Sequence, residues 1–167
     1  MMTMGMMSAL VLWGLVATTA MTSILLAGQG LGLSRMSLTF LLGSALSGKR
    51  GTATVLGFVL YLLGGWAFAF LYFAFFRSLG LATWWAGAAL GFVHGVFLLA
   101  CAMPLLPYLH PRMASEHHGV TSLRLLEPPG FFATNYGYQT PAVLLVAQVV
   151  YGGVLGAGVQ LQHLMHG

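Results

Sequence analysis

The sequence predicts an all-α, polytopic membrane protein. The expected fold is a bundle of four transmembrane helices, with an interfacial helix and an ordered cytoplasmic connection between spans three and four. Three observations lead to this fold class. The 167-residue chain is 59% hydrophobic but only 5% charged, against roughly 25% charged residues in soluble domains. Its apolar residues form four stretches of about 20 residues, the length that crosses a bilayer as a helix. Its six Lys and Arg residues fall mostly in two connections. We therefore expect one integral membrane domain over residues 1–167.

The four apolar stretches predict spans over residues 6–28, 54–76, 81–103 and 141–162. We interpret the first as a retained span, because no basic region precedes it and no small-residue cleavage signature follows it. Pro104 and Pro107 are expected to end the third span, because proline lacks the amide hydrogen that a continuing helix needs. Pro141 suits the first turn of the fourth span.

The connection between spans one and two carries a shorter helical pattern. Ser34 is a candidate N-cap, and apolar residues recur after it at helical spacing: Leu38, Leu41, Leu42, Ala45 and Leu46. The opposite face carries Arg35, Ser37 and Ser44. The pattern indicates either a short helix in the membrane interface or an extension of span one, and the sequence does not separate the two.

The connection between spans three and four, about 35 residues long, is too long to be structureless in a compact protein. Pro111 and the residues after it, up to His118, are compatible with a short helix. Pro128-Pro129-Gly130 predicts a turn. The aromatic residues that follow should hold the returning chain at the membrane surface; they are Phe131, Phe132, Tyr136 and Tyr138.

The distribution of basic residues predicts the orientation. Connections one and three contain Arg35, Lys49, Arg50, Arg112 and Arg124, whereas the opposite side contains only Arg77. The positive-inside rule therefore places these two connections in the cytoplasm and both termini outside.

Small residues in three of the spans predict close helix packing, and in span two they are Gly57, Gly64 and Gly65. Span three has glycines at every fourth position, and span four has a matching smooth patch; the set is Gly87, Gly91, Gly95, Gly152 and Gly156. Such stripes let two backbones approach closely where lipid removes the usual hydrophobic driving force. The default expectation is contact within one chain, and contact with another chain stays open.

A few polar residues fall at similar depth inside the predicted spans. At a rise of 1.5 Å per residue, His94 lies about 14 Å and Gln148 about 10 Å from the cytoplasmic ends of their spans. Together they define a possible midplane polar layer of Thr18, Thr22, Tyr61, His94 and Gln148. Polar groups at this depth are often functional. The simpler interpretation is a neutral imidazole that hydrogen-bonds across helices and fixes their register.

Two groups of residues are candidates for metal binding. One is the histidine and carboxylate cluster of the third connection: His110, Glu116, His117 and His118. The other lies at the chain ends, where thioether and imidazole ligands suit copper: Met1, Met2, Met4, Met6 and Met7 at the N-terminus and His163, Met165 and His166 at the C-terminus. Neither spacing matches an established metal signature. A solvated segment and an ordinary chain end are the plainer interpretations.

Several function classes lack support in the sequence. No Asp, Glu, Lys or Arg lies within a predicted span, so a proton relay or charged-ion pathway lacks its usual parts. No nucleophile elbow, phosphate loop, haem-attachment motif or pair of carboxylates is present. We therefore expect no catalysis and no cofactor. The basic residues are few and scattered, which gives nucleic-acid binding no support.

Five short stretches resemble a family of four-span bacterial membrane proteins without an assigned activity. They are HPRMASE from His110, LEPPGFF from Leu126, NYG from Asn135, VYGGVLG from Val150 and the GLVATTAMT run of span one. The resemblance covers nearly the whole chain and implies a four-helix fold in the bacterial inner membrane. It implies no substrate or catalytic residue. Where family members often have a histidine in span four, this chain has Gln148.

Two functional hypotheses follow. The first is a non-catalytic small membrane subunit that binds a larger integral membrane assembly, such as an electron-transport complex, or a second copy of itself. The second is a carrier or sensor for a metal ion or a small neutral molecule, which would use the midplane polar layer. The lipid bilayer is the partner common to both.

Overall fold

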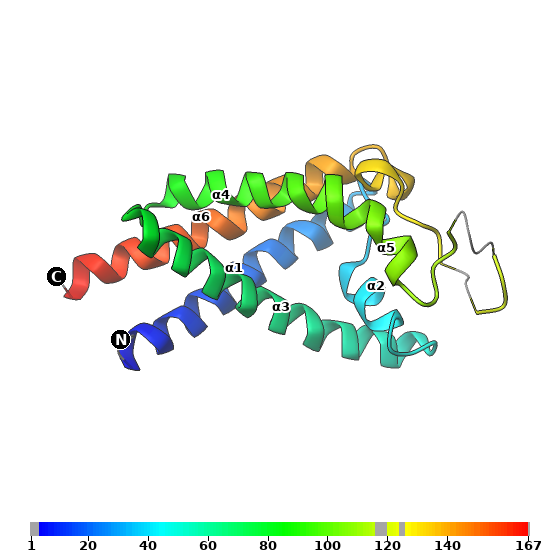
Figure 1. The fold of residues 1–167 in the computed structure, drawn as a ribbon, viewed down its shortest axis with the longest axis horizontal. Helices are drawn as coiled ribbons and strands as arrows, with labels where there is room; N and C mark the ends of the chain where they lie inside the picture. Colours follow the sequence, from blue (N-terminus) through cyan, green and yellow to red (C-terminus); the bar gives the residue numbers. More distant parts are fainter. Residues whose placement is uncertain (1–3, 116–119, 124–125, 167) are drawn as a thin grey trace. The chain divides into compact units, whose positions relative to one another are not determined.

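The computed structural model describes residues 4–115, 120–123 and 126–166, and only the backbone of residues 4–6, 163, 165 and 166. In chain order the elements are α1 (Met4–Gly30), α2 (Leu38–Ser44), α3 (Arg50–Leu79), α4 (Trp84–Phe97), the π-helix η1 (Leu98–Ala102), α5 (Met103–Leu109), the 3₁₀ segment η2 (Phe131–Tyr136) and α6 (Thr140–His166) (Figure 1). The described residues contain no strand, only an isolated bridge between Met113 and Leu126.

Four segments are long and apolar enough to cross a membrane: Met7–Gly30, Arg50–Leu79, Trp84–Leu109 and Thr140–Gln162. The predicted all-α, four-span fold class is confirmed, and the chain is a multi-pass membrane protein. Each span exceeds the roughly 20 residues that a bilayer requires.

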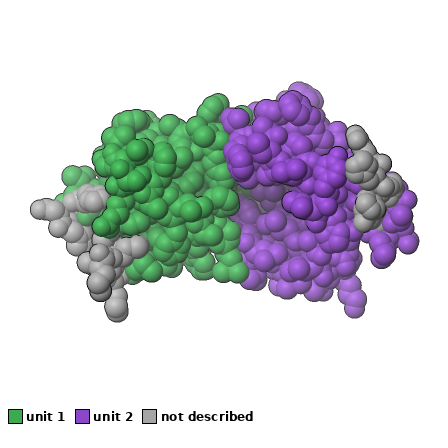
Figure 2. Space-filling model, in the orientation of Figure 1, with its two compact units in different colours: residues 1–25, 62–95, 145–167 green, residues 26–61, 96–144 purple. Residues whose placement is uncertain are grey.

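The chain forms two compact units, and all four spans contribute a segment to each (Figure 2). Unit 1 consists of residues 1–25, 62–95 and 145–167, and unit 2 consists of residues 26–61 and 96–144.

In unit 1, glycines bring the backbones of α4 and α6 into direct contact. A Cβ atom on Gly87 would collide with the carbonyl oxygen of Gly152, and one on Gly91 would collide with that of Gln148. A Cβ atom on Gly156 would collide with the carbonyl oxygen of Thr83. Gly95 is less crowded, because its nearest neighbours are side-chain atoms of Leu145 and Gln148. The glycine faces of the two helices therefore meet within one chain, and no side chain could replace their closest members without moving a helix.

Tryptophans fix α1 within the same unit. The Trp66 indole nitrogen donates a hydrogen bond to the Val11 carbonyl oxygen at 3.1 Å, and its ring covers Gly14. Trp13 covers Gly158 of α6 in the same way. Each indole fills the space over a glycine, which is how a large and a small residue complement one another between packed helices.

In unit 2, α1 ends in a turn, and the helix that follows begins at a different cap residue from the predicted one. Gly32 adopts a positive φ of 73°, which ends α1 because glycine alone takes this conformation without strain. The N-cap of α2 is Ser37, whose hydroxyl accepts a hydrogen bond from the Phe40 amide at 3.4 Å, and not Ser34 as predicted. Ser34 is buried instead, and its hydroxyl accepts from Thr140 at 2.9 Å. The Ser34 hydroxyl also accepts the Met36 amide hydrogen at 3.1 Å, so Ser34 holds the turn before α2 and does not cap the helix.

The contacts of α2 decide between the two interpretations of the first connection. A Cβ atom on Gly43 would collide with the carbonyl oxygen of Ala53, and one on Gly57 would collide with that of Thr39. A separate short helix therefore lies against the first turns of α3, and α2 does not extend span one.

The third span continues beyond the predicted prolines. Pro104 and Pro107 were expected to end it near Met103, but the helical path runs to Leu109. The π-helix Leu98–Ala102 directly precedes α5 and widens the backbone there. Pro104 closely follows this segment, where the hydrogen-bond pattern changes: the Met103 amide donates to the Leu98 carbonyl oxygen.

The described part of the third connection is ordered, but not by the predicted helix. Residues 111–115 form a turn and an extended stretch. The Ala114 amide donates to the Leu126 carbonyl at 3.1 Å, and the Leu126 amide donates to the Arg112 carbonyl at 3.1 Å. The remaining residues of the predicted helix, 116–118, lie outside the described residues.

The glycine contact yields a direct test. Replacement of Gly91 by alanine should lower the free energy of unfolding in detergent by about 1–3 kcal/mol, because the added methyl group meets a backbone carbonyl. Titration of the purified protein with a denaturing detergent measures the change. Gly64→Ala is the matched control, since no atom lies within 4 Å of its added Cβ, and it should leave the free energy unchanged or slightly raised. Equal losses in both variants would contradict the packing described.

Candidate functional site

The core of unit 1 contains a hydrogen-bonded histidine. His94 follows the Gly87–Gly91 stripe on α4 and faces α3, where its Nδ1 atom lies 3.1 Å from the hydroxyl of Tyr72. Phe68 stacks on the imidazole, with 4.3 Å between ring centroids. Tyr72 is 4% exposed, so this interhelical bond is shielded from competing solvent.

A second tyrosine continues the polar core toward α6. The Tyr151 hydroxyl donates to the Gly65 carbonyl oxygen on α3 at 2.6 Å, and its ring meets that of Tyr72 edge-on, with 5.5 Å between centroids. His94, Tyr72 and Tyr151 therefore connect α4, α3 and α6 through one cluster. We name these three residues and Gln148, one turn before Tyr151, the polar core.

Two atoms of the polar core have no hydrogen-bond partner among the described residues: His94 Nε2 and Gln148 Oε1, both buried. When the Tyr72 hydroxyl donates to Nδ1 of His94, the imidazole hydrogen lies on Nε2. His94 Nε2 is then a hydrogen-bond donor and Gln148 Oε1 is an acceptor. A buried polar group without a partner costs about 1–3 kcal/mol. A hydroxyl group, from water or from a small hydroxyl compound, both donates and accepts, so it has the chemistry to satisfy either atom.

The predicted midplane layer is brought together only in part. Thr18 and Thr22 lie in unit 1 but bond within their own helix, to the carbonyl oxygens of Gly14 at 2.8 Å and Thr18 at 2.6 Å. Tyr61 is buried in unit 2 and is not part of the polar core.

Sequence reasoning missed Tyr72 and Tyr151. Tyr151 follows Gln148 by three residues, which is the helical spacing that puts both on one face, and this signal was available. Tyr72 differs from its neighbours Phe73, Phe75 and Phe76 by its hydroxyl group, but the sequence does not show which residue that hydroxyl contacts.

In unit 2, His110 joins the third connection to the end of α2. Its Nε2 atom lies 3.0 Å from the Leu41 carbonyl oxygen and 3.2 Å from the Ser44 hydroxyl, and its Nδ1 atom accepts the Arg112 amide at 3.2 Å. The Arg112 guanidinium donates to the carbonyl oxygens of Ser44 and Ala45, at 2.5 and 3.1 Å. These contacts satisfy the carbonyl groups that the last turn of a helix leaves without intrahelical partners.

The Ser44–His110 pair resembles a nucleophile and its base in distance only. An Nδ1 atom that accepts an amide hydrogen fixes the imidazole hydrogen on Nε2, so Nε2 cannot take a proton from the serine. The Ser44 hydroxyl donates to the Leu41 carbonyl oxygen at 2.8 Å instead. Both ring nitrogens of His110 are thus engaged, and the arrangement is structural.

The predicted metal sites lie largely outside the described residues. Glu116, His117 and His118 lie outside them, and so do the side chains of His163, Met165 and His166. Within the part of the chain that the structure describes, no three His, Cys, Asp or Glu side chains gather closely enough to hold a metal ion.

The polar core predicts a measurable coupling between His94 and Tyr72. Tyr72→Phe should destabilise the protein by about 1–3 kcal/mol, because it leaves the buried Nδ1 atom without a partner. His94→Phe in the Tyr72→Phe background should cost less than His94→Phe alone. Unfolding in detergent of the single and double variants gives the coupling free energy, expected at about 0.6–1.7 kcal/mol. Strictly additive losses would show that the two side chains do not interact.

His110 predicts a pH dependence of stability. Burial lowers the pKa of His110, the hydrogen bond to Leu41 opposes this shift, and the Arg112 charge adds to it. The unfolded chain, with a histidine pKa near 6.5, therefore binds the proton more readily than the folded protein. Stability should be constant above about pH 6.5 and fall below it, by at most about 1.4 kcal/mol per pH unit.

The measurement is the free energy of unfolding between pH 5 and 8 for the native protein and for His110→Asn. The variant should be less stable throughout, and its curve should be flatter below about pH 6.5 because this titration is absent. Parallel curves would assign the pH dependence to other histidines.

Comparison of the sequence with protein-family models and curated proteins, and of the structure with solved structures, found no match. The function therefore has to be argued from the contacts and chemistry of this chain.

Proposed function

We propose that the protein is a non-catalytic small integral membrane subunit that binds a larger membrane assembly through residues 126–139, which we name the return segment. The observation that carries this proposal is a strained but tightly held backbone that exposes aromatic side chains outside the four spans. Electron-transport complexes are the assemblies to search first. Self-association is the alternative use of the same surface.

The return segment contains two non-glycine residues in the left-handed conformation. Phe132 and Ala133 have φ values of 53° and 58°. Such residues cost about 1–3 kcal/mol each and persist only where surrounding contacts hold them. Ala133 is fully buried, and its amide donates to the Gly130 carbonyl oxygen at 3.2 Å.

Side chains on both flanks hold this backbone. The Tyr136 hydroxyl donates to the Glu127 carbonyl oxygen at 2.6 Å, and the Asn135 amide group donates to that of Pro128 at 2.9 Å. Burial, followed by the nearby Glu127 charge, raises the pKa of Tyr136 to about 12, so its hydroxyl stays protonated as a donor.

Arg35 ties the return segment to the first connection. Its guanidinium donates to the Asn135 carbonyl oxygen at 2.6 Å, and its amide donates to the Tyr136 carbonyl oxygen at 2.7 Å. The Glu127 carboxylate lies 3.7 Å from the same guanidinium, an exposed pair that contributes little by itself. The backbone contacts are the stronger restraint.

The product of these restraints is a rigid loop with exposed aromatic residues. Phe131 is 72% exposed and Tyr138 is 82% exposed, and both lie outside the spans. Aromatic residues on a pre-organised loop lose little conformational entropy on binding, which makes them effective anchors at interfaces. Strain that is maintained around such residues is typical of functional loops.

The proposed orientation, membrane and non-enzymatic role each have separate support. The distribution of Lys and Arg supports a cytoplasmic return segment with both termini on the periplasmic side. The family resemblance supports the bacterial inner membrane. The described Ser–His geometry supports a non-enzymatic role.

The second candidate function is binding of a small neutral hydroxyl compound at the polar core. The observation that favours it is the pair of buried atoms without partners, His94 Nε2 and Gln148 Oε1. Retention of such a compound by the native protein, and its loss in Gln148→Leu, would support this function over the first.

Purification from native membranes in a mild detergent tests the leading proposal. The native chain should co-migrate with at least one other membrane subunit. Phe131→Ser and Tyr138→Ser together should weaken that association about 30-fold, the effect of losing about 2 kcal/mol at an interface anchor. Affinity measured in detergent with the isolated partner gives the value.

Leu123→Ser is the matched control, because Leu123 is 74% exposed in the same connection but lies outside the return segment. It should leave the association unchanged. A monomer that never co-migrates with another subunit, or equal losses in the control and test variants, would refute the proposal.

A further inference from the structure

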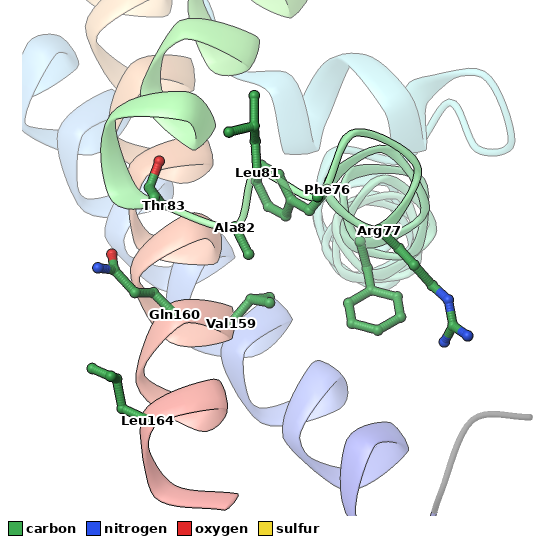
Figure 3. A pocket seen from close by; sticks show the side chains of 10 residues that line it. Phe76, Arg77, Leu81, Ala82, Thr83, Val159, Gln160 and Leu164 are labelled. Carbon is green, nitrogen blue, oxygen red and sulfur yellow. The ribbon is translucent and has the colours of Figure 1, made fainter. Parts of the chain in front are cut away.

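Unit 1 contains a pocket at the end where α3 turns into α4. Its volume is about 450 Å³, within the range of roughly 300–1,000 Å³ of small-molecule sites. The walls come from the last turns of α3, the loop at residues 80–83 and the C-terminal part of α6 (Figure 3).

The lining of the pocket is mainly apolar. Phe73 and Phe76 form the α3 wall, Leu81 and Ala82 form the loop wall, and Val159 and Leu164 form the α6 wall. In Figure 3, the side chains of Ala82 and Val159 point toward one another across the space between the loop and α6. An apolar cavity of this kind binds water poorly and hydrocarbon well.

Polar groups occur only where the spans end. Thr83 and Gln160 belong to the lining, but Gln160 is occupied, since its side-chain oxygen accepts the Trp84 amide at 3.4 Å. Arg77 stands two residues before the end of α3 and is exposed. Figure 3 shows its side chain extending outward from α3, so its charge lies at the rim and not inside the pocket.

The sequence of unit 1 contains Arg77 but no Asp or Glu, so no acidic side chain of the same unit pairs with Arg77. The chain has two acidic residues, Glu116 and Glu127, and both belong to unit 2. Arg77 is also the only Lys or Arg in the sequence of unit 1. An arginine near the end of a span extends to the headgroup level of the bilayer, where its guanidinium can bind a phosphate through paired hydrogen bonds.

We propose that this pocket binds an acyl chain of an anionic phospholipid, whose phosphate group is held at the rim by Arg77. The position of the pocket at the ends of membrane-spanning segments makes lipid the medium around it. The apolar walls match the acyl chain, and Arg77, the one Lys or Arg in the sequence of unit 1, matches the phosphate. A phospholipid satisfies both features at once, with its tail inside and its headgroup outside.

The test is native mass spectrometry of the delipidated protein with equimolar phosphatidylglycerol and phosphatidylcholine of identical acyl chains. The native protein should retain one phosphatidylglycerol in preference to phosphatidylcholine. Arg77→Gln should reduce that preference about tenfold, because both headgroups carry phosphate but only the first has a net negative charge for Arg77 to stabilise. Ala82→Trp should reduce retention of both lipids, because the indole fills the pocket.

Val93→Trp is the control for an added indole, since Val93 is 62% exposed on a span of the same unit and does not line the pocket. It should retain phosphatidylglycerol normally. Circular dichroism and gel filtration check the folding of each variant, and Arg77→Gln, an exposed substitution, keeps the test decisive if Ala82→Trp misfolds.

Three results would overturn the proposal. One is no stoichiometric lipid on the native protein, and another is an unchanged preference in Arg77→Gln. The third is displacement of the lipid by millimolar inorganic phosphate, which would identify the rim as a site for free phosphate.

Discussion

The contact that the candidate site depends on most is the approach of α4 to α6 without side chains between them. In a bilayer, lipid is as apolar as leucine, so helices associate through fit and hydrogen bonds and not through the hydrophobic effect. Gly87, Gly91 and Gly152 supply that fit, because a methyl group on any of them would meet a backbone carbonyl. The same contact positions His94. The imidazole sits beside the glycine stripe and faces Tyr72 on α3, while Gln148 on α6 packs against Gly95.

Helix backbones also approach one another closely in unit 2, but there polar side chains additionally hold a short helix in place. With 7 residues, α2 is too short to be stable alone. Gly43 brings α2 against the backbone of α3, and His110 and Arg112 supply donors to its last carbonyl groups. Those carbonyls would otherwise lack intrahelical partners. The third connection therefore stabilises the first, although more than sixty residues separate them in sequence.

The parts of the fold that could be predicted from the sequence follow from composition, and the parts that could not follow from tertiary contacts. The four spans and the glycine stripe are visible because each is a property of a continuous segment. The continuation of the third span past Pro104 is not visible in the sequence, since it depends on a π-helix that no residue pattern predicts. Ser34 and Ser37 are both capping residue types, but Ser37 accepts the Phe40 amide as an N-cap, whereas Ser34 accepts the Met36 amide in a turn and a tertiary bond from Thr140. For the same reason His94 could be identified as a candidate while its partner Tyr72 could not.

The charge distribution explains why the two units are stabilised by different means. Unit 1 has a single Lys or Arg and no carboxylate, so its specific contacts are neutral: glycines, indoles and the tyrosine–histidine bond. Unit 2 contains the other five basic residues and both glutamates, and its connections are held by Arg35 and Arg112. The Lys and Arg residues are thus concentrated in unit 2, and each unit is held together by the groups that it contains. An aromatic-bearing loop held by the Arg35 guanidinium suits a protein partner, whereas an apolar pocket with one arginine at its rim suits an anionic lipid.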